Sequence, residues 1–174
     1  TLGTSLFVFG FAFGPIAWGP LSEIYGRKNI LMLSGFLYVC FTFAVATAKD
    51  LQTIMICRFF AGCAGGGAVV ITPAVLADIY GPASRGKAMN IFAAVLFGAP
   101  MLSPIAGGFI VKNSSLGWRW TSYMVGIIAS ASLAATVFLL DESHHGIIMV
   151  NKAETLRRRT GNWGIAAPHE EFSL

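Results

Sequence analysis

The chain has 174 residues, of which 55% are hydrophobic and 11% are charged. Soluble domains carry about 25% charged residues, so a soluble fold of this composition would lack the polar surface to cover itself, and insertion in a membrane is expected. The net charge of +4 does not favour nucleic-acid binding, because the basic residues lie at segment ends and form no patch with aromatic residues.

Five apolar segments are each long enough to cross a bilayer, which takes about 20 residues. In chain order they cover residues 1–21, 29–48, 51–77, 89–111 and 120–140. Short polar stretches separate them, and a polar tail covers residues 141–174. The sequence therefore predicts an all-α membrane protein with a transmembrane domain over residues 1–140. In the tail, residues 151–159 are expected to form a short surface helix, which Gly161 and Pro168 then break.

The first polar stretch, residues 19–28, combines glycine with charge at the point where a helix hairpin must turn. Gly19 and Gly26 let the backbone turn tightly and pack closely. Glu23 precedes Arg27 by four residues, which is the favourable order for a helical ion pair. With Lys28 directly after Arg27, these residues predict a compact charged loop between the first two spans.

Lysine and arginine gather on one side of the predicted topology. That side holds Arg27, Lys28, Arg85, Lys87, Lys152, Arg157, Arg158 and Arg159. The opposite side holds Lys49, Lys112 and Arg119. Because an excess of positive charge marks cytosolic loops, the richer side is expected in the cytosol, and the first span begins outside. An odd number of spans with an outer start suits a chain that lacks one earlier helix.

Arg58 lies inside the third span, about 10 Å from its outer end at 1.5 Å per residue. A charge at this depth is costly and by default faces a cavity or a partner, which makes Arg58 a candidate functional residue. The alternative is a side chain that snorkels to the outer interface. Gly62, Gly65 and Gly66 follow and favour a tightly packed or cavity-lining helix. Asp78 ends the same span. Its carboxylate is either solvated at the end of the helix or part of a charged cluster.

The fourth span carries a proline and glycine motif at residues 98–108. Pro100 and Pro104 each remove a helix hydrogen-bond donor and are expected to bend the helix. Gly98, Gly107 and Gly108 would let a neighbouring backbone approach closely. The alternative is an ordinary kinked membrane helix.

Nothing in the sequence indicates catalysis or metal binding. The three cysteines lie in apolar runs and are interpreted as small apolar fillers. The three histidines show no ligand spacing on one helix face, and there is neither a nucleophilic triad nor a phosphate-binding loop. We therefore predict no enzyme, no cofactor and no metal.

Three motifs in sequence resemble the major facilitator superfamily of transporters. Residues 19–28 resemble the signature loop between its second and third spans. Arg58, followed four residues later by Gly62, resembles its fourth-span motif, and residues 98–108 resemble the antiporter motif of its fifth span. The pattern around Arg85 is similar to that of fungal drug:proton antiporters, the twelve-span multidrug and polyamine-transporter-like branch.

This resemblance implies the major facilitator fold, which has two halves of six helices. The chain would supply the second to sixth spans of the N-terminal half, and residues 141–174 would begin the central cytosolic loop. The first span and the C-terminal half of the parent transporter would then be its partners, together with the lipid bilayer.

The resemblance also implies a role for each motif. Arg58 would take part in proton coupling. Glu23, Arg27 and Asp78 would form a charge cluster that holds helices together on the cytosolic side in one transport state. The antiporter motif would act mechanically, with Ser103 in place of the usual glycine as a small-for-small change.

The implied function is secondary active transport, namely proton-coupled export of small organic compounds or drugs by alternating access. Family resemblance places such a protein in the plasma membrane, or alternatively in the vacuolar membrane. Two other functions stay open. One is a proton symporter or sugar-type uptake carrier, and the other is a truncated, non-transporting membrane protein that acts by assembling with other helices.

Overall fold

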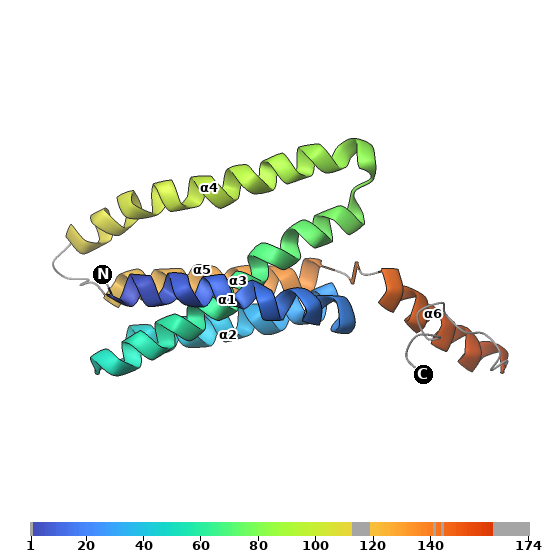
Figure 1. Ribbon diagram of the computed structural model, residues 1–174, viewed down its shortest axis with the longest axis horizontal. Coiled ribbons are helices and arrows are strands. Elements are labelled where there is room, and N and C mark those ends of the chain that lie inside the picture. Colours follow the sequence, from blue (N-terminus) through green and yellow to red (C-terminus); the bar gives the residue numbers. More distant parts are fainter. Residues whose placement is uncertain (1, 113–118, 141, 144, 162–174) are drawn as a thin grey trace.

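In the computed structural model, the described residues are 2–112, 119–140, 142–143 and 145–161, and they form six α-helices without a strand (Figure 1). The helices are α1 (Leu2–Tyr25), α2 (Arg27–Thr47), α3 (Leu51–Ile79), α4 (Pro82–Lys112), α5 (Arg119–Leu139) and α6 (His145–Thr160). Helices α1 to α5 are long and apolar enough to cross a membrane. The five predicted spans and the all-α fold are thus confirmed.

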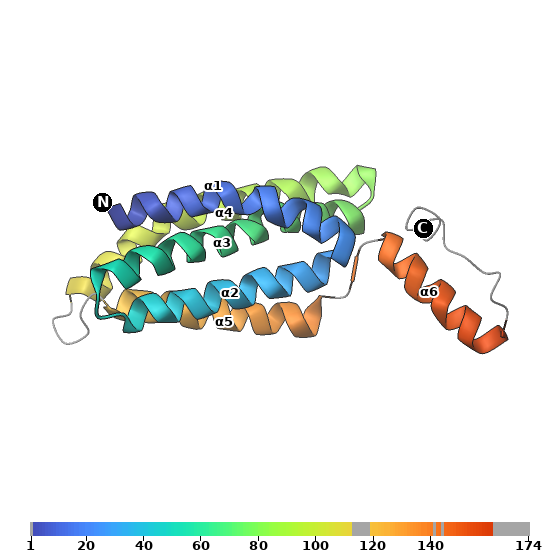
Figure 2. The same ribbon diagram turned by 60° about the horizontal axis from the view of Figure 1, so that its bottom comes forward.

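Helices α1, α2, α3 and α5 form a bundle, in which α3 packs against both α1 and α2, and α2 packs against α5 (Figure 2). Helix α4 stands apart from this bundle and joins it mainly through its ends (Figure 1). None of the described side chains of α4 is buried. Helix α6 projects from the end of the bundle opposite the N-terminus.

Glycines bring the backbones of α1 and α3 into direct contact. Gly10 and Gly14 are spaced four residues apart on α1, so they lie on one face of the helix. A Cβ atom on Gly10 would overlap the carbonyl group of Phe59, and one on Gly62 would overlap the carbonyl group of Phe7. The contact is therefore reciprocal, and small residues on both helices are what allow it.

Two other glycines singled out in the sequence also lie at helix contacts. A Cβ atom on Gly65 would stand 3.3 Å from the ring of Tyr38 on α2. One on Gly66 would stand 2.9 Å from Cδ of Pro15 on α1. Helix α3 thus presents a glycine face to α1 and another to α2, and this places it at the centre of the bundle.

The end of the bundle where α1 passes into α2, called the inner end below because the distribution of lysine and arginine predicts that it faces the cytosol, has a small apolar core. Ile30, Ile71 and Val75 are buried there, and Trp18 and Leu140 pack against them. The Trp18 indole Nε1–H also donates a hydrogen bond of 2.8 Å to the carbonyl oxygen of Cys63 on α3. Because Leu140 directly follows α5, this core fixes the end of the last span beside the start of α2.

The turn between the first two spans is tighter than the sequence predicted. Helix α1 continues to Tyr25 and α2 begins at Arg27, so only Gly26 interrupts the helical path. Gly26 adopts φ 98°, a left-handed conformation that glycine reaches without a steric cost. The expected charged loop is therefore a break of one residue.

Helix α6 begins earlier than expected, at His145 instead of residue 151, and it ends at Thr160. Gly161 follows with φ 66°, and its N–H donates to the Arg157 carbonyl oxygen at 3.0 Å. This is a common glycine termination of a helix and agrees with the predicted break at Gly161. Pro168 lies outside the described residues.

Candidate functional site

A charged cluster joins three helices at the inner end of the bundle. Arg27 begins α2 and Asp78 lies in the last turn of α3; Arg27 Nε is 3.3 Å from Asp78 Oδ2. Both side chains are largely shielded, with exposed fractions of 14% and 23%. Arg27 Nη1 also donates to the Ser22 hydroxyl at 3.1 Å, and this hydroxyl donates to the Gly19 carbonyl oxygen at 2.7 Å. The guanidinium of Arg27 thereby ties α1 to α3.

Glu142 closes the cluster from the segment after α5. Its carboxylate accepts hydrogen bonds from the backbone N–H groups of Arg27 at 3.0 Å and Lys28 at 3.3 Å. The first N–H groups of a helix have no partner within the helix, and the helix dipole favours a negative charge at this end. Gly26, the residue before α2, has no side chain to cap it. Glu142 supplies the cap from a distant part of the chain.

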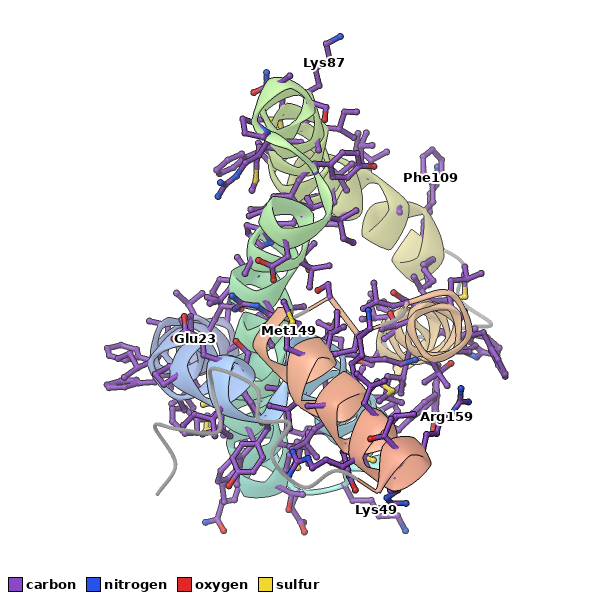
Figure 3. The ribbon with its side chains drawn as sticks, turned by 90° about the vertical axis from the view of Figure 1, so that its right-hand side faces the viewer. Glu23, Lys49, Lys87, Phe109, Met149 and Arg159 are labelled. Atoms are coloured by element: carbon purple, nitrogen blue, oxygen red, sulfur yellow. The ribbon has the colours of Figure 1, made fainter. Side chains whose placement is uncertain are left out.

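Glu23 does not take the predicted place in this cluster. Its side chain is exposed on α1 (Figure 3), and within the part of the chain that the structure describes it forms no ion pair with Arg27. The favourable spacing of four residues requires a continuous helix, and Gly26 breaks the helix between the two residues. Arg27 turns to Asp78 instead.

Two other residues of the stretch 19–28, Gly19 and Lys28, differ in what surrounds them. A Cβ atom on Gly19 would make an ordinary contact of 3.8 Å with Cγ1 of Val70. Lys28 is half-buried and contributes its backbone N–H to the Glu142 cap. Ser22 and Glu142 were not expected in this cluster from the sequence. The one signal for Glu142 in the sequence was its position as an acidic residue two positions after the last predicted span.

Arg58 faces an open cavity of about 410 Å³ between the bundle and α4. The cavity is lined by Phe7, Tyr38, Thr42, Val45, Arg58, Ala61, Ser103, Thr121, Ser122 and Val125. These residues come from all five long helices. Side chains with hydroxyl groups make up half of the lining, and Arg58 is its one charged member. A small organic molecule fits a cavity of this size.

The polar groups of this cavity have unused hydrogen-bonding capacity. Among the described residues, Arg58 makes no hydrogen bond or ion pair, and the buried Thr121 hydroxyl has no partner. A Cβ atom on Gly3 would lie 3.5 Å from Cδ of Arg58, so the apolar stem of Arg58 lies against α1. The guanidinium and the Thr121 hydroxyl can together receive a ligand with acceptor atoms.

The proline and glycine motif of α4 lies mostly outside the packed bundle. The helix continues through Pro100 and Pro104. No atom of the described chain lies within 4 Å of a Cβ built on Gly98, Gly107 or Gly108. The expected close contact at these glycines is therefore absent from the described helices. Ser103, which also lies within this motif, lines the Arg58 cavity.

Residues 1–168 match the family model described as Major Facilitator Superfamily. The chain belongs to the major facilitator superfamily. It is an integral membrane protein with several spans, and its membership confirms the family inferred from the three motifs. The family consists of transporters, in agreement with the prediction that the chain is not an enzyme.

Relatives in the major facilitator superfamily extend well beyond this chain. It is 63% identical over 174 residues to the major facilitator superfamily multidrug transporter FLU1 of Candida albicans, covering 100% of the chain and 28% of that protein. It is 49% identical over 173 residues to the multidrug transporter TPO1_2 of Candida glabrata, covering 99% of the chain and 30% of that protein. It is 45% identical over 171 residues to the efflux pump bik6 of Gibberella fujikuroi, covering 98% of the chain and 35% of that protein. The chain thus spans about a third of the length of these relatives.

A solved structure supports the same fold. The xylose transporter XylE of E. coli, in an inward open conformation, superposes with a TM-score of 0.71 at 22% identity. The match covers 92% of this chain and 42% of that one. At this level of identity the likeness establishes the major facilitator fold and carries no information about the substrate.

Proposed function

We propose that the chain is part of a proton-coupled exporter of small organic compounds that works by alternating access. The names of its relatives, multidrug transporters and an efflux pump, support export of such compounds. The observation that carries the proposal is the placement of Arg58 in a cavity lined by all five long helices. A fixed cation in such a cavity provides a binding point within the membrane.

Arg58 would couple substrate and proton through its charge. A guanidinium does not lose its proton in proteins, so Arg58 cannot itself be the proton carrier. No acidic residue lines the cavity in the described part of the chain. We infer that Arg58 acts on a carboxyl group from another helix of the transporter, lowering the pKa of that group whenever no substrate shields the two charges.

The inner charge cluster would act as the gate. Arg27, Asp78 and Glu142 connect the inner ends of α1, α2 and α3 with the segment after α5. Such a cluster has two arrangements, intact and broken, and a ligand shifts the balance by binding one arrangement more tightly. Glu23, exposed beside the cluster, would join it only after the hairpin changes conformation.

The remaining parts of the transporter are proposed from the family. A first span and a C-terminal half would complete the cavity wall, and substrate would bind near the midplane between the two halves. The glycine faces of α4 would pack against one of these helices. The plasma membrane is the proposed location, with the vacuolar membrane as the alternative.

The test is efflux from an efflux-deficient host that expresses the full-length transporter. Arg58→Ala is expected to abolish proton-dependent efflux of its substrates, and Arg58→Lys is expected to retain part of it. Arg158→Ala, a change of an exposed arginine on α6, is the control and should transport normally. Full efflux by a correctly inserted Arg58→Ala protein would refute the proposed role. Accumulation of the compounds instead of export would point to uptake, and no transport in either direction would point to a non-transporting protein.

A further inference from the structure

The surface of α6 divides into two different faces. Met149 and Leu156 are seven residues, about two turns, apart and therefore lie on one face of the helix. Their exposed fractions are 56% and 41%. Lys152 lies three residues after Met149, and Arg159 lies three residues after Leu156. These two basic residues are therefore also seven residues apart, and both are exposed. An apolar stripe and a basic stripe thus run side by side along α6, with Met149 and Arg159 at its two ends (Figure 3).

The opposite face of α6 carries a neutralised pair. Arg158 Nη2 bonds Glu154 Oε1 across one helical turn. At about 100° per residue, Arg158 lies on the side of the helix opposite Met149. Among the described residues, the positive charge that Lys152 and Arg159 place next to the apolar stripe has no such acidic partner.

The position of α6 brings its start close to the membrane, and the helix projects from there away from the bundle (Figures 1 and 2). The connection from Leu140 to the start of α6 spans five residue steps and reaches at most about 17 Å. Within it, Glu142 is held against the N-terminus of α2 by two hydrogen bonds. Helix α6 therefore starts at the level where the spans leave the bilayer, on the side that the distribution of lysine and arginine assigns to the cytosol.

We propose that α6 is an interfacial helix that binds the anionic phospholipid surface of the cytosolic leaflet. The stripe of Met149 and Leu156 enters the boundary between headgroups and acyl chains, while the stems of Lys152 and Arg159 lie along it and their charges reach the phosphates. The paired Arg158 and Glu154 face the cytosol. This assignment does not depend on the direction of transport or on proton coupling.

The test uses the full-length transporter in lipid nanodiscs. A nitroxide is attached at Leu156→Cys after the native cysteines are changed to alanine. Its collision with oxygen, which enters the membrane, is compared with its collision with a nickel chelate, which stays in water. In phosphatidylcholine discs with about one third phosphatidylserine, most of the label is expected at headgroup depth, and in pure phosphatidylcholine most of it is expected in water.

Two neighbouring arginines provide matched variants. Arg159→Gln removes a charge from the membrane face and is expected to lower the ratio of docked to free label about fivefold, since a base near an anionic surface contributes about 1 kcal/mol. Arg158→Gln makes the same change on the other face and should leave the ratio unaltered. Arg159→Lys should restore docking. The proposal is overturned if both lipids give the same depth, if both glutamine variants act alike, or if the label is shielded from both reagents, which would indicate a protein partner.

Discussion

Removing the Glu142 carboxylate should loosen the start of α2 while leaving the rest of that helix intact. In Glu142→Ala the N–H groups of Arg27 and Lys28 lose their acceptors at 3.0 and 3.3 Å. Loss of a helix cap costs about 0.5–2 kcal/mol, and the lost attraction to the helix dipole is part of this cost. The local opening of the first turn should therefore become about 2- to 30-fold more frequent.

Hydrogen–deuterium exchange measures this opening directly. In the chain reconstituted in nanodiscs, exchange of the amides of Arg27 and Lys28 should accelerate by that factor in Glu142→Ala. Glu142→Gln keeps an acceptor oxygen without the charge, so it should give a smaller increase. Glu154→Ala, which removes an exposed acid on α6, is the control and should leave these two amides unchanged. Unaltered exchange in Glu142→Ala would show that the cap contributes nothing and would refute the argument.

Two further predictions concern the helix contacts. Gly10→Ala should lower the melting temperature of the chain in nanodiscs, because the new Cβ overlaps the backbone of α3 and such overpacking costs about 1–3 kcal/mol. Gly107→Ala is the matched change at an open position and should not lower it; equal losses would contradict the packing argument. A double-mutant cycle of Arg27→Gln with Asp78→Asn should give a coupling energy of about 1 kcal/mol in thermal or denaturant unfolding, whereas additive effects would mean that the 3.3 Å ion pair does not stabilise the inner end.

The spans were predictable from the sequence because membrane insertion imposes a simple local rule. A helix must satisfy its own backbone in lipid, so about 20 apolar residues suffice to identify it. The same local logic identified Arg58 as a functional candidate, since a charge within a span is costly wherever it lies. The cluster of Arg27 with Asp78 was expected only from the resemblance to the family.

Contacts between distant segments were less predictable. The glycines at 10 and 14 became informative only when α3 was seen to present glycines to them. Glu142 caps α2 across more than a hundred residues, and no local pattern marks that partnership. Glu23 is not paired with Arg27 in this structure, because the helical pairing needs a continuous helix through Gly26, whose positive φ diverts the chain.

The inner cluster and the Arg58 cavity lie at different depths of the same bundle, and α3 connects them. Asp78 belongs to its last turn, and Arg58 lies about 30 Å away along the helix, at 1.5 Å per residue. Between them, glycines hold α3 tightly against α1. Helix α3 carries Pro73 between the two sites, so we expect a change at the cavity to reach the inner cluster through a bend or shift of α3.

The most direct test of the account is proton movement during transport by the purified full-length protein in liposomes. Addition of a substrate identified by efflux should drive protons in the direction opposite to the substrate, and Arg58→Ala should remove this coupled proton flux. Protons that move together with the substrate, or substrate that moves with no proton flux, would contradict proton-coupled export.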